Sequence, residues 1–235
     1  MRKVLGLALG GLLAVACAHH TEEARLDDSG LARLNEDQMQ PVDNARLDLG
    51  RAQDQVAKAR ANEADARARL EVANSEREVA QAQVKRAAAQ RDLLKKQYAD
   101  RDAMAQADQD ISAAQEALRA SELKLQYLNQ NVALAAAERQ AAEAHVRTQA
   151  AVVEQTKYQA MQAGGAPQVA SINPGTLDAR LAEARSQEAQ TQRAVAERRS
   201  QAQSLYDRWQ QAAARSRLTS NPQEVPPPPP VAEPR

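Results

Sequence analysis

The chain has 235 residues, and its 31 lysine and arginine residues balance its 31 aspartate and glutamate residues. This balance leaves no basic field of the kind that binds nucleic acid or anionic lipid headgroups. Hydrophobic residues make up 43% of the chain, but there is no phenylalanine, one tryptophan and only four tyrosines, which is too few bulky side chains for a large globular core. The composition therefore predicts an elongated all-α protein without a nucleic-acid partner.

The first 16 residues have the layout of a secretory signal peptide. A short basic start is followed by an apolar run from Val4 to Leu13, about half the length that a membrane-spanning helix needs. Small residues then lead to Cys17, the only cysteine of the chain. The stretch Ala14-Val15-Ala16-Cys17 resembles the lipobox of bacterial lipoproteins, in which a peptidase cuts before a cysteine that carries the lipid and becomes the mature N-terminus.

This resemblance implies that Cys17 is lipidated and anchors the chain to a membrane of a Gram-negative envelope. Ala18 follows the cysteine, whereas lipoproteins kept in the inner membrane usually have aspartate there, so the resemblance points to an outer-membrane lipoprotein. We expect it to face the periplasm, with exposure at the cell surface as the alternative. The alternative is an ordinary signal-peptidase site after Ala16, which would release a soluble protein with a free thiol. An unpaired cysteine in an oxidising compartment favours the lipid.

Residues 17–41 are mostly polar and predict a flexible tether with at most a short helix, ending at Pro41, which can open a helix. Residues 42–163 are rich in alanine and carry two runs of seven-residue repeats of nearly equal length. The repeat changes phase by one residue near its midpoint. We therefore expect a long antiparallel coiled-coil hairpin that turns within residues 98–106, although one continuous helix is the alternative.

The predicted hairpin has a register in which the numbers of facing residues add up to about 205. Small residues of the first run then meet large residues of the second, as in the layer of Ala80 and Leu125. The same register predicts charge pairs across the flanks of the coil. These pairs are Arg60 with Glu143, Lys95 with Asp108 and Arg69 with Glu138.

Two charged residues that interrupt the apolar seams, Glu63 and Arg139, fall in neighbouring layers of this register. In one interpretation their long side chains reach out of a narrow, alanine-lined interface to solvent. In the other interpretation they form an ion pair that aligns the two helices.

Residues 164–175 contain the clearest breaks in the interior of the chain and predict a loop. Residues 176–218 predict a third helix that docks on the hairpin as part of a three-helix bundle, with Trp209 as a packing anchor. Residues 219–235 hold seven of the ten prolines and predict a disordered, extended tail.

The sequence offers no recognisable catalytic constellation, cofactor motif or small-molecule substrate site, and we expect neither a metal nor an enzyme. His19 and His20 lie in the predicted tether, and His145 lies on a flank of the second run without a nucleophile to serve. The chain resembles coiled-coil lipoproteins of the Gram-negative envelope. This resemblance implies a structural or scaffolding protein that binds envelope proteins, or itself, through its coiled coil or its tail.

The alternative is a periplasmic accessory or chaperone-like subunit of a trans-envelope machine. The coil resembles the hairpins of efflux adaptor proteins, but the sequence lacks the β-rich domains that flank those hairpins.

Overall fold

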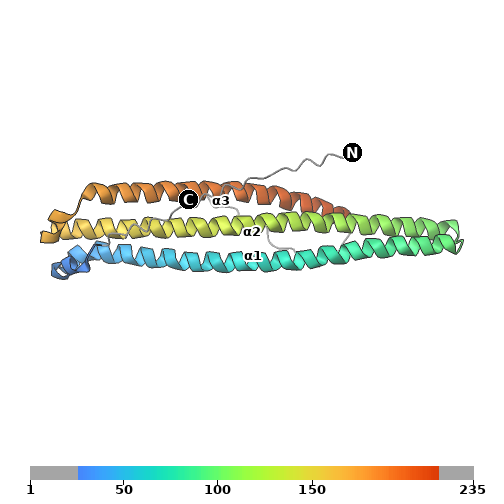
Figure 1. Ribbon diagram of the computed structural model, residues 1–235, viewed down its shortest axis with the longest axis horizontal. Helices are drawn as coiled ribbons and strands as arrows, with labels where there is room; N and C mark the ends of the chain where they lie inside the picture. The colour runs from blue at the N-terminus through green and yellow to red at the C-terminus, as the bar shows by residue number, and fades with distance from the viewer. Residues whose placement is uncertain (1–25, 217–235) are drawn as a thin grey trace, which may run out of the picture.

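The computed structural model describes residues 26–216, and this part of the chain is all-α (Figure 1). It consists of three long helices and two short 3₁₀ helices: η1 (Asp28–Arg33), α1 (Glu36–Lys96), α2 (Arg101–Ala163), η2 (Pro167–Ser171) and α3 (Pro174–Ser216). Helix α2 runs antiparallel to both α1 and α3 and packs along each of them. The predicted fold class, a long helical hairpin with a third helix, is confirmed. The predicted signal peptide, Cys17 and the proline-rich tail lie outside the described residues.

The hairpin turn is formed by residues 97–100, a tighter turn than the predicted stretch of 98–106. Tyr98 has a positive φ of 53°, which reverses the chain, and its side chain is 95% exposed. Asp100 then caps α2, because its side chain accepts a hydrogen bond from the Ala103 amide at 2.8 Å. A single left-handed residue and a capping aspartate thus make the turn without glycine or proline.

Helix α1 begins at Glu36, so the prediction of a tether up to residue 41 was wrong for its last part. Asn35 and Gln38 form a capping box, in which each side chain accepts a hydrogen bond from the other residue's amide. Pro41 lies inside the helix. It has no backbone N–H and so donates no hydrogen bond to the Asp37 carbonyl, four residues earlier. Upstream, Leu31 of η1 packs in a small core with Val42 and Met161, so contacts with the end of α2 also order this segment.

Helix α3 packs along α2 rather than in a closed bundle with both helices of the hairpin. An ion pair between Glu138 and Arg199 at 2.9 Å and a hydrogen bond between His145 and Glu188 at 2.8 Å join α2 to α3. The extensive helix contacts in the described part of the chain are those of α2 with α1 and of α2 with α3. The predicted third helix therefore docks on the hairpin through α2, and residues of all three helices share the buried cluster around Trp209.

An aromatic cluster closes the far end of the α2–α3 contact. The rings of Tyr127 and Trp209 stack at 5.7 Å between centroids, and Tyr206 meets both rings edge to face. Ala73 of α1 and Leu128 of α2 complete this buried cluster. Beyond it, α1 and α2 continue to the turn as a two-helix arm, which Figure 1 shows extending past the end of α3.

The ion pairs across the hairpin lie close to the predicted register, and one of them, Arg60 with Glu143, is a predicted pair. In four ion pairs between α1 and α2 the residue numbers add up to 199 to 203 rather than to 205. From the turn outward, these pairs are Arg91 with Asp108, Glu76 with Lys124, Glu63 with Arg139, and Arg60 with Glu143.

Of the charge pairs that the sequence predicted, the structure forms Arg60 with Glu143 at 3.4 Å. Asp108 binds Arg91 instead of Lys95, and Glu138 binds Arg199 of α3 instead of Arg69. The tight turn shortens the connection, and α3 takes partners that a two-helix register assigns to α1.

We predict that Trp209→Ala lowers the free energy of unfolding by about 3–5 kcal/mol, because it removes a fully packed aromatic side chain. The measurement is urea unfolding followed by circular dichroism. Tyr98→Ala is the matched control, and it should change stability by less than about 0.5 kcal/mol, since the Tyr98 side chain is exposed. Equal effects of the two substitutions would contradict the packing described here.

Candidate functional site

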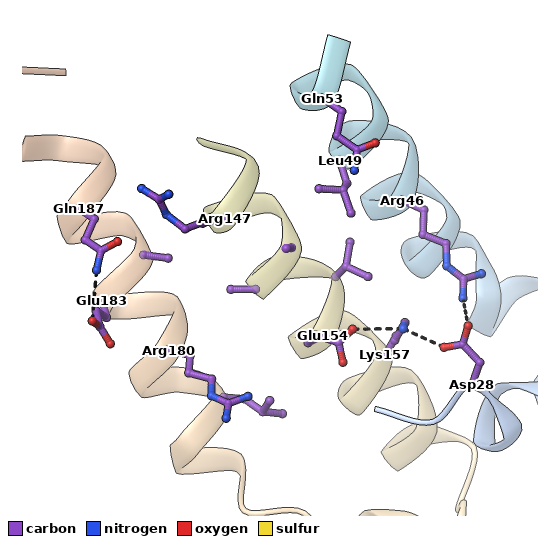
Figure 2. A pocket seen from close by; sticks show the side chains of 15 residues that line it. Asp28, Arg46, Leu49, Gln53, Arg147, Glu154, Lys157, Arg180, Glu183 and Gln187 are labelled. Carbon is purple, nitrogen blue, oxygen red and sulfur yellow. Dashed lines mark hydrogen bonds and ion pairs between the residues drawn. The ribbon is translucent and has the colours of Figure 1, made fainter. Parts of the chain in front are cut away.

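An open groove of about 640 Å³ lies at the end of the molecule opposite the hairpin turn. Helix α2 lies between α1 and α3 there, and all three helices contribute lining residues (Figure 2). The α2 residues Ala150, Ala151 and Val153 are small or apolar, while Leu49 of α1 and Leu177 of α3 add larger apolar groups. The groove is therefore an open trough in which an apolar floor is bordered by charged and polar side chains.

Charged residues tie the segment before α1 to one edge of this groove. Asp28 accepts from Arg46 at 2.9 Å and from Lys157 at 2.8 Å, as the dashed lines in Figure 2 show. Lys157 also binds Glu154 at 3.2 Å, and Glu154 accepts a hydrogen bond from the Leu26 amide at 2.7 Å. We call these five residues the N-terminal clasp, because they fix the first described residues against α2.

The clasp changes the acid–base behaviour of Asp28. The hydrogen bond from Lys157 lowers the pKa of the Asp28 carboxyl below its ordinary value of 3.8 and outweighs the opposing effect of burial. The charges of Lys157 and Arg46 act in the same direction. Asp28 is therefore ionised at neutral pH and holds both basic side chains.

Two arginines of the groove keep their charges free for an incoming group. Arg147 of α2 and Arg180 of α3 line the groove, and neither forms an ion pair with another residue of the described chain. Figure 2 shows both side chains on the α3 side of the groove. An apolar trough flanked by unpaired guanidinium groups suits an apolar helix or peptide that carries carboxylates.

A second charged cluster lies inside the hairpin, at the position where the sequence left two interpretations open. The structure brings Glu63 and Arg139 together: the Arg139 Nε lies 2.7 Å from the Glu63 Oε2, and Glu63 is only 5% exposed. Arg67 also binds Glu63, while Glu143 accepts from Arg139 at 2.9 Å and from Arg60 at 3.4 Å. These five side chains form a series of ion pairs of alternating charge that links α1 to α2.

The pKa values in this cluster follow from its pairing. Hydrogen bonds to Glu63 and Glu143 raise the pKa of Arg139. Burial alone would raise the pKa of the Glu143 carboxyl, but the hydrogen bonds from Arg139 and Arg60, together with their charges, leave it below its ordinary value. Arg139 and Glu143 therefore stay charged at neutral pH, which suits structural alignment better than proton transfer.

The other residues singled out from the sequence have different positions. Trp209 lies in the aromatic cluster as a buried side chain, 5% exposed. Leu125 packs against that same cluster, and Ala80 is buried outside it, so the layer of Ala80 with Leu125 stays a prediction. Cys17 lies outside the described residues.

Sequence reasoning missed the clasp and the tyrosines of the aromatic cluster. Asp28 was assigned to a tether, and its partners Arg46 and Lys157 lie far from it in sequence, so no spacing pattern connects them. Tyr206 and Trp209 are three residues apart on one helix face, and this spacing was the available signal for an aromatic contact.

Within residues 26–216, no group of histidine, cysteine, aspartate and glutamate side chains is arranged to hold a metal ion. In the same range, none of the helices has an apolar stretch long enough to span a bilayer. Comparison with known proteins finds no matching family model, no matching curated protein and no matching solved structure.

We predict that the role of the Glu63 cluster in stability depends on which partner is removed. Glu63→Ala removes a carboxylate that pairs with Arg139 at the helix interface. It should lower the free energy of unfolding by roughly 1–3 kcal/mol. The double variant Glu63→Leu with Arg139→Leu removes both charges and should recover most of that loss. Urea unfolding of the two variants gives the comparison, and a double variant that is less stable than Glu63→Ala would contradict it.

The clasp should open in acid. Since the folded pKa of Asp28 lies below 3.8, its ion pairs contribute fully above that pH and are lost as the pH falls through the lower, folded pKa. Hydrogen exchange of residues 26–34 should therefore be slow at pH 6 and faster near pH 3, after correction for the intrinsic rates. In Asp28→Asn the corrected exchange should be fast at both pH values. Equal protection in the variant and the wild type at pH 6 would contradict this account.

Proposed function

We propose that this protein is a non-enzymatic, lipid-anchored scaffolding protein of a Gram-negative envelope. It is held by a lipid on Cys17 to the outer membrane, faces the periplasm, and binds another envelope component along its helices. The observation that carries the proposal is the position of the clasp. It fixes Leu26, only nine residues after the lipobox cysteine, at the end of the rod opposite the hairpin turn.

This placement gives the rod a membrane end and a distant end. Nine residues span at most about 30 Å, so a lipid on Cys17 keeps the groove near the membrane surface. Helix α1 has 61 residues and therefore extends for about 90 Å. The two-helix arm and its exposed Tyr98 lie at the distant end.

The groove is the part of the rod best suited to hold a component close to the membrane. Its apolar floor offers area for burial, and Arg147 and Arg180 offer charge to carboxylates. Binding of this kind requires shape and charge but no reacting groups. It supports a scaffold, in which the rod fixes the position of what it binds.

The alternative is an accessory or chaperone-like subunit of a trans-envelope machine, and the two-helix arm is the observation that favours it. The arm ends in a turn whose tyrosine is almost fully exposed, as expected of a tip that inserts between other helices. Cross-linking in intact cells distinguishes the two functions, because a scaffold is captured with few fixed partners and a chaperone with many unfolded chains.

We predict that Cys17→Ser abolishes labelling by a lipid probe and moves the protein from the membrane fraction to the soluble fraction. The thiol is the acceptor of the lipid, and within residues 26–216 no helix could replace the anchor. Fractionation of cells that express each form, with an antibody against the folded rod, is the measurement. Unchanged membrane partition of the serine variant would rule out the lipid anchor.

A further inference from the structure

The face of α1 that points away from α2 carries a second seven-residue repeat. Val72, Val79 and Leu93 are separated by multiples of seven residues and are 57–59% exposed, and Leu47 lies on the same face with 60% exposure. Large apolar side chains at this spacing on a solvent face are typical of a helix with an absent partner. These four side chains are not buried by the contact between α1 and α2.

These residues belong to two rows of heptad positions that run along this face of α1. We call the two rows together the outer seam. Every member is exposed, and each lies two residues after a position of the repeat that packs on α2, about 200° around the helix. One row consists of Lys58, Asp65, Val72, Val79, Arg86 and Leu93, and the other of Ala61, Ala68, Ser75, Ala82, Ala89 and Lys96. Helix α1 thus has packing seams on opposite faces.

We propose that the outer seam joins two copies of this chain side by side and antiparallel, in a register where facing residue numbers add up to 154. Each valine or leucine of the first row then meets an alanine or serine of the second copy. Val72 faces Ala82, Val79 faces Ser75 and Leu93 faces Ala61 of the second copy. Layers of large with small residues let two helices approach closely, and a two-fold axis makes every such contact occur twice.

The charges of the seam decide between a parallel and an antiparallel pair. In a parallel pair Lys58, Asp65 and Arg86 would each face its own copy, which places like charges inside the contact. In the antiparallel register Asp65 lies one layer from Arg86 of the second copy, within reach of that long side chain. On one flank Glu71 faces Lys85 of the second copy. The charges therefore favour the antiparallel pair.

Two glutamates near the two-fold axis, Glu76 and Glu78, face their own copies in this register. Lys124 of α2 holds Glu76 at 2.6 Å on each chain and so neutralises that contact. The remaining contact of Glu78 with its copy is on the flank, where water screens it. Lys58 also faces Lys96 of the second copy, once at each end of the seam. These three repulsive contacts oppose two contacts between Glu71 and Lys85 and two between Asp65 and Arg86, so the attractive contacts are in the majority.

Pairing through the outer seam leaves the groove, the clasp and α3 free. Because the axis passes near residue 77, the two copies of Glu36 lie about 120 Å apart. The pair would present one groove at each end of a longer rod. This inference concerns α1 alone and does not depend on the lipid anchor.

Self-association of the full chain with Cys17→Ser tests the seam itself. The variant Ala82→Glu with Ala89→Glu places two carboxylates inside the seam and should weaken self-association by at least about tenfold in analytical ultracentrifugation. The matched control, Gln81→Glu with Ala88→Glu, places them on exposed neighbouring positions outside the seam and should change it less than about twofold. A wild-type chain that stays monomeric, or equal weakening in the two variants, overturns the proposal.

Spin labels at two flank positions, Asn62 and Gln90, test the orientation in the same Cys17→Ser chain. In the antiparallel register these positions face each other, so a mixture of chains labelled at Asn62 with chains labelled at Gln90 should give a distance below about 20 Å. Each labelled chain alone should give about 40 Å, from 28 helical residues of offset. Short distances in the two single-label samples indicate a parallel pair and overturn the proposed register.

Discussion

The packing of α2 on two neighbours at once is the constraint on which the rest of the structure depends. Helix α2 has to offer one buried face to α1 and another to α3, and alanine supplies much of both, as at Ala135 and Ala144. Small side chains keep the helices close and leave little apolar surface for a deep core. The result is a rod whose stability is distributed along its length, with local anchors where larger side chains occur.

Those anchors lie at different levels of the rod and have different chemistry. The aromatic cluster of Tyr127 and Trp209 marks where α3 ends, and the small core around Met161 marks where the chain enters the hairpin. Between them, Glu63 and Arg139 join α1 and α2 by charge. A uniform alanine interface would allow neighbouring registers of similar energy, so these distinct contacts select one.

The same architecture separates the surfaces that can bind. The groove at the clasp end is flanked by the unpaired Arg147 and Arg180, the outer seam of α1 exposes Val72, Val79 and Leu93, and the turn presents Tyr98. None of these surfaces overlaps another, because each lies on a different face or at a different end. A rod built in this way can hold several contacts at once, which is what a scaffold requires.

The sequence by itself determined the helices, the hairpin and the break before α3, because these depend on repeats and on turn residues that act locally. It also indicated that Glu63 and Arg139 lie in neighbouring layers, since they interrupt apolar seams. Only the tertiary structure decided the register, the side of α2 that α3 covers, and the clasp around Asp28. An alanine-rich seam has nearly the same shape every seven residues, so the repeat leaves the register open. The tight turn, the aromatic cluster and ion pairs between residues far apart in the chain select it.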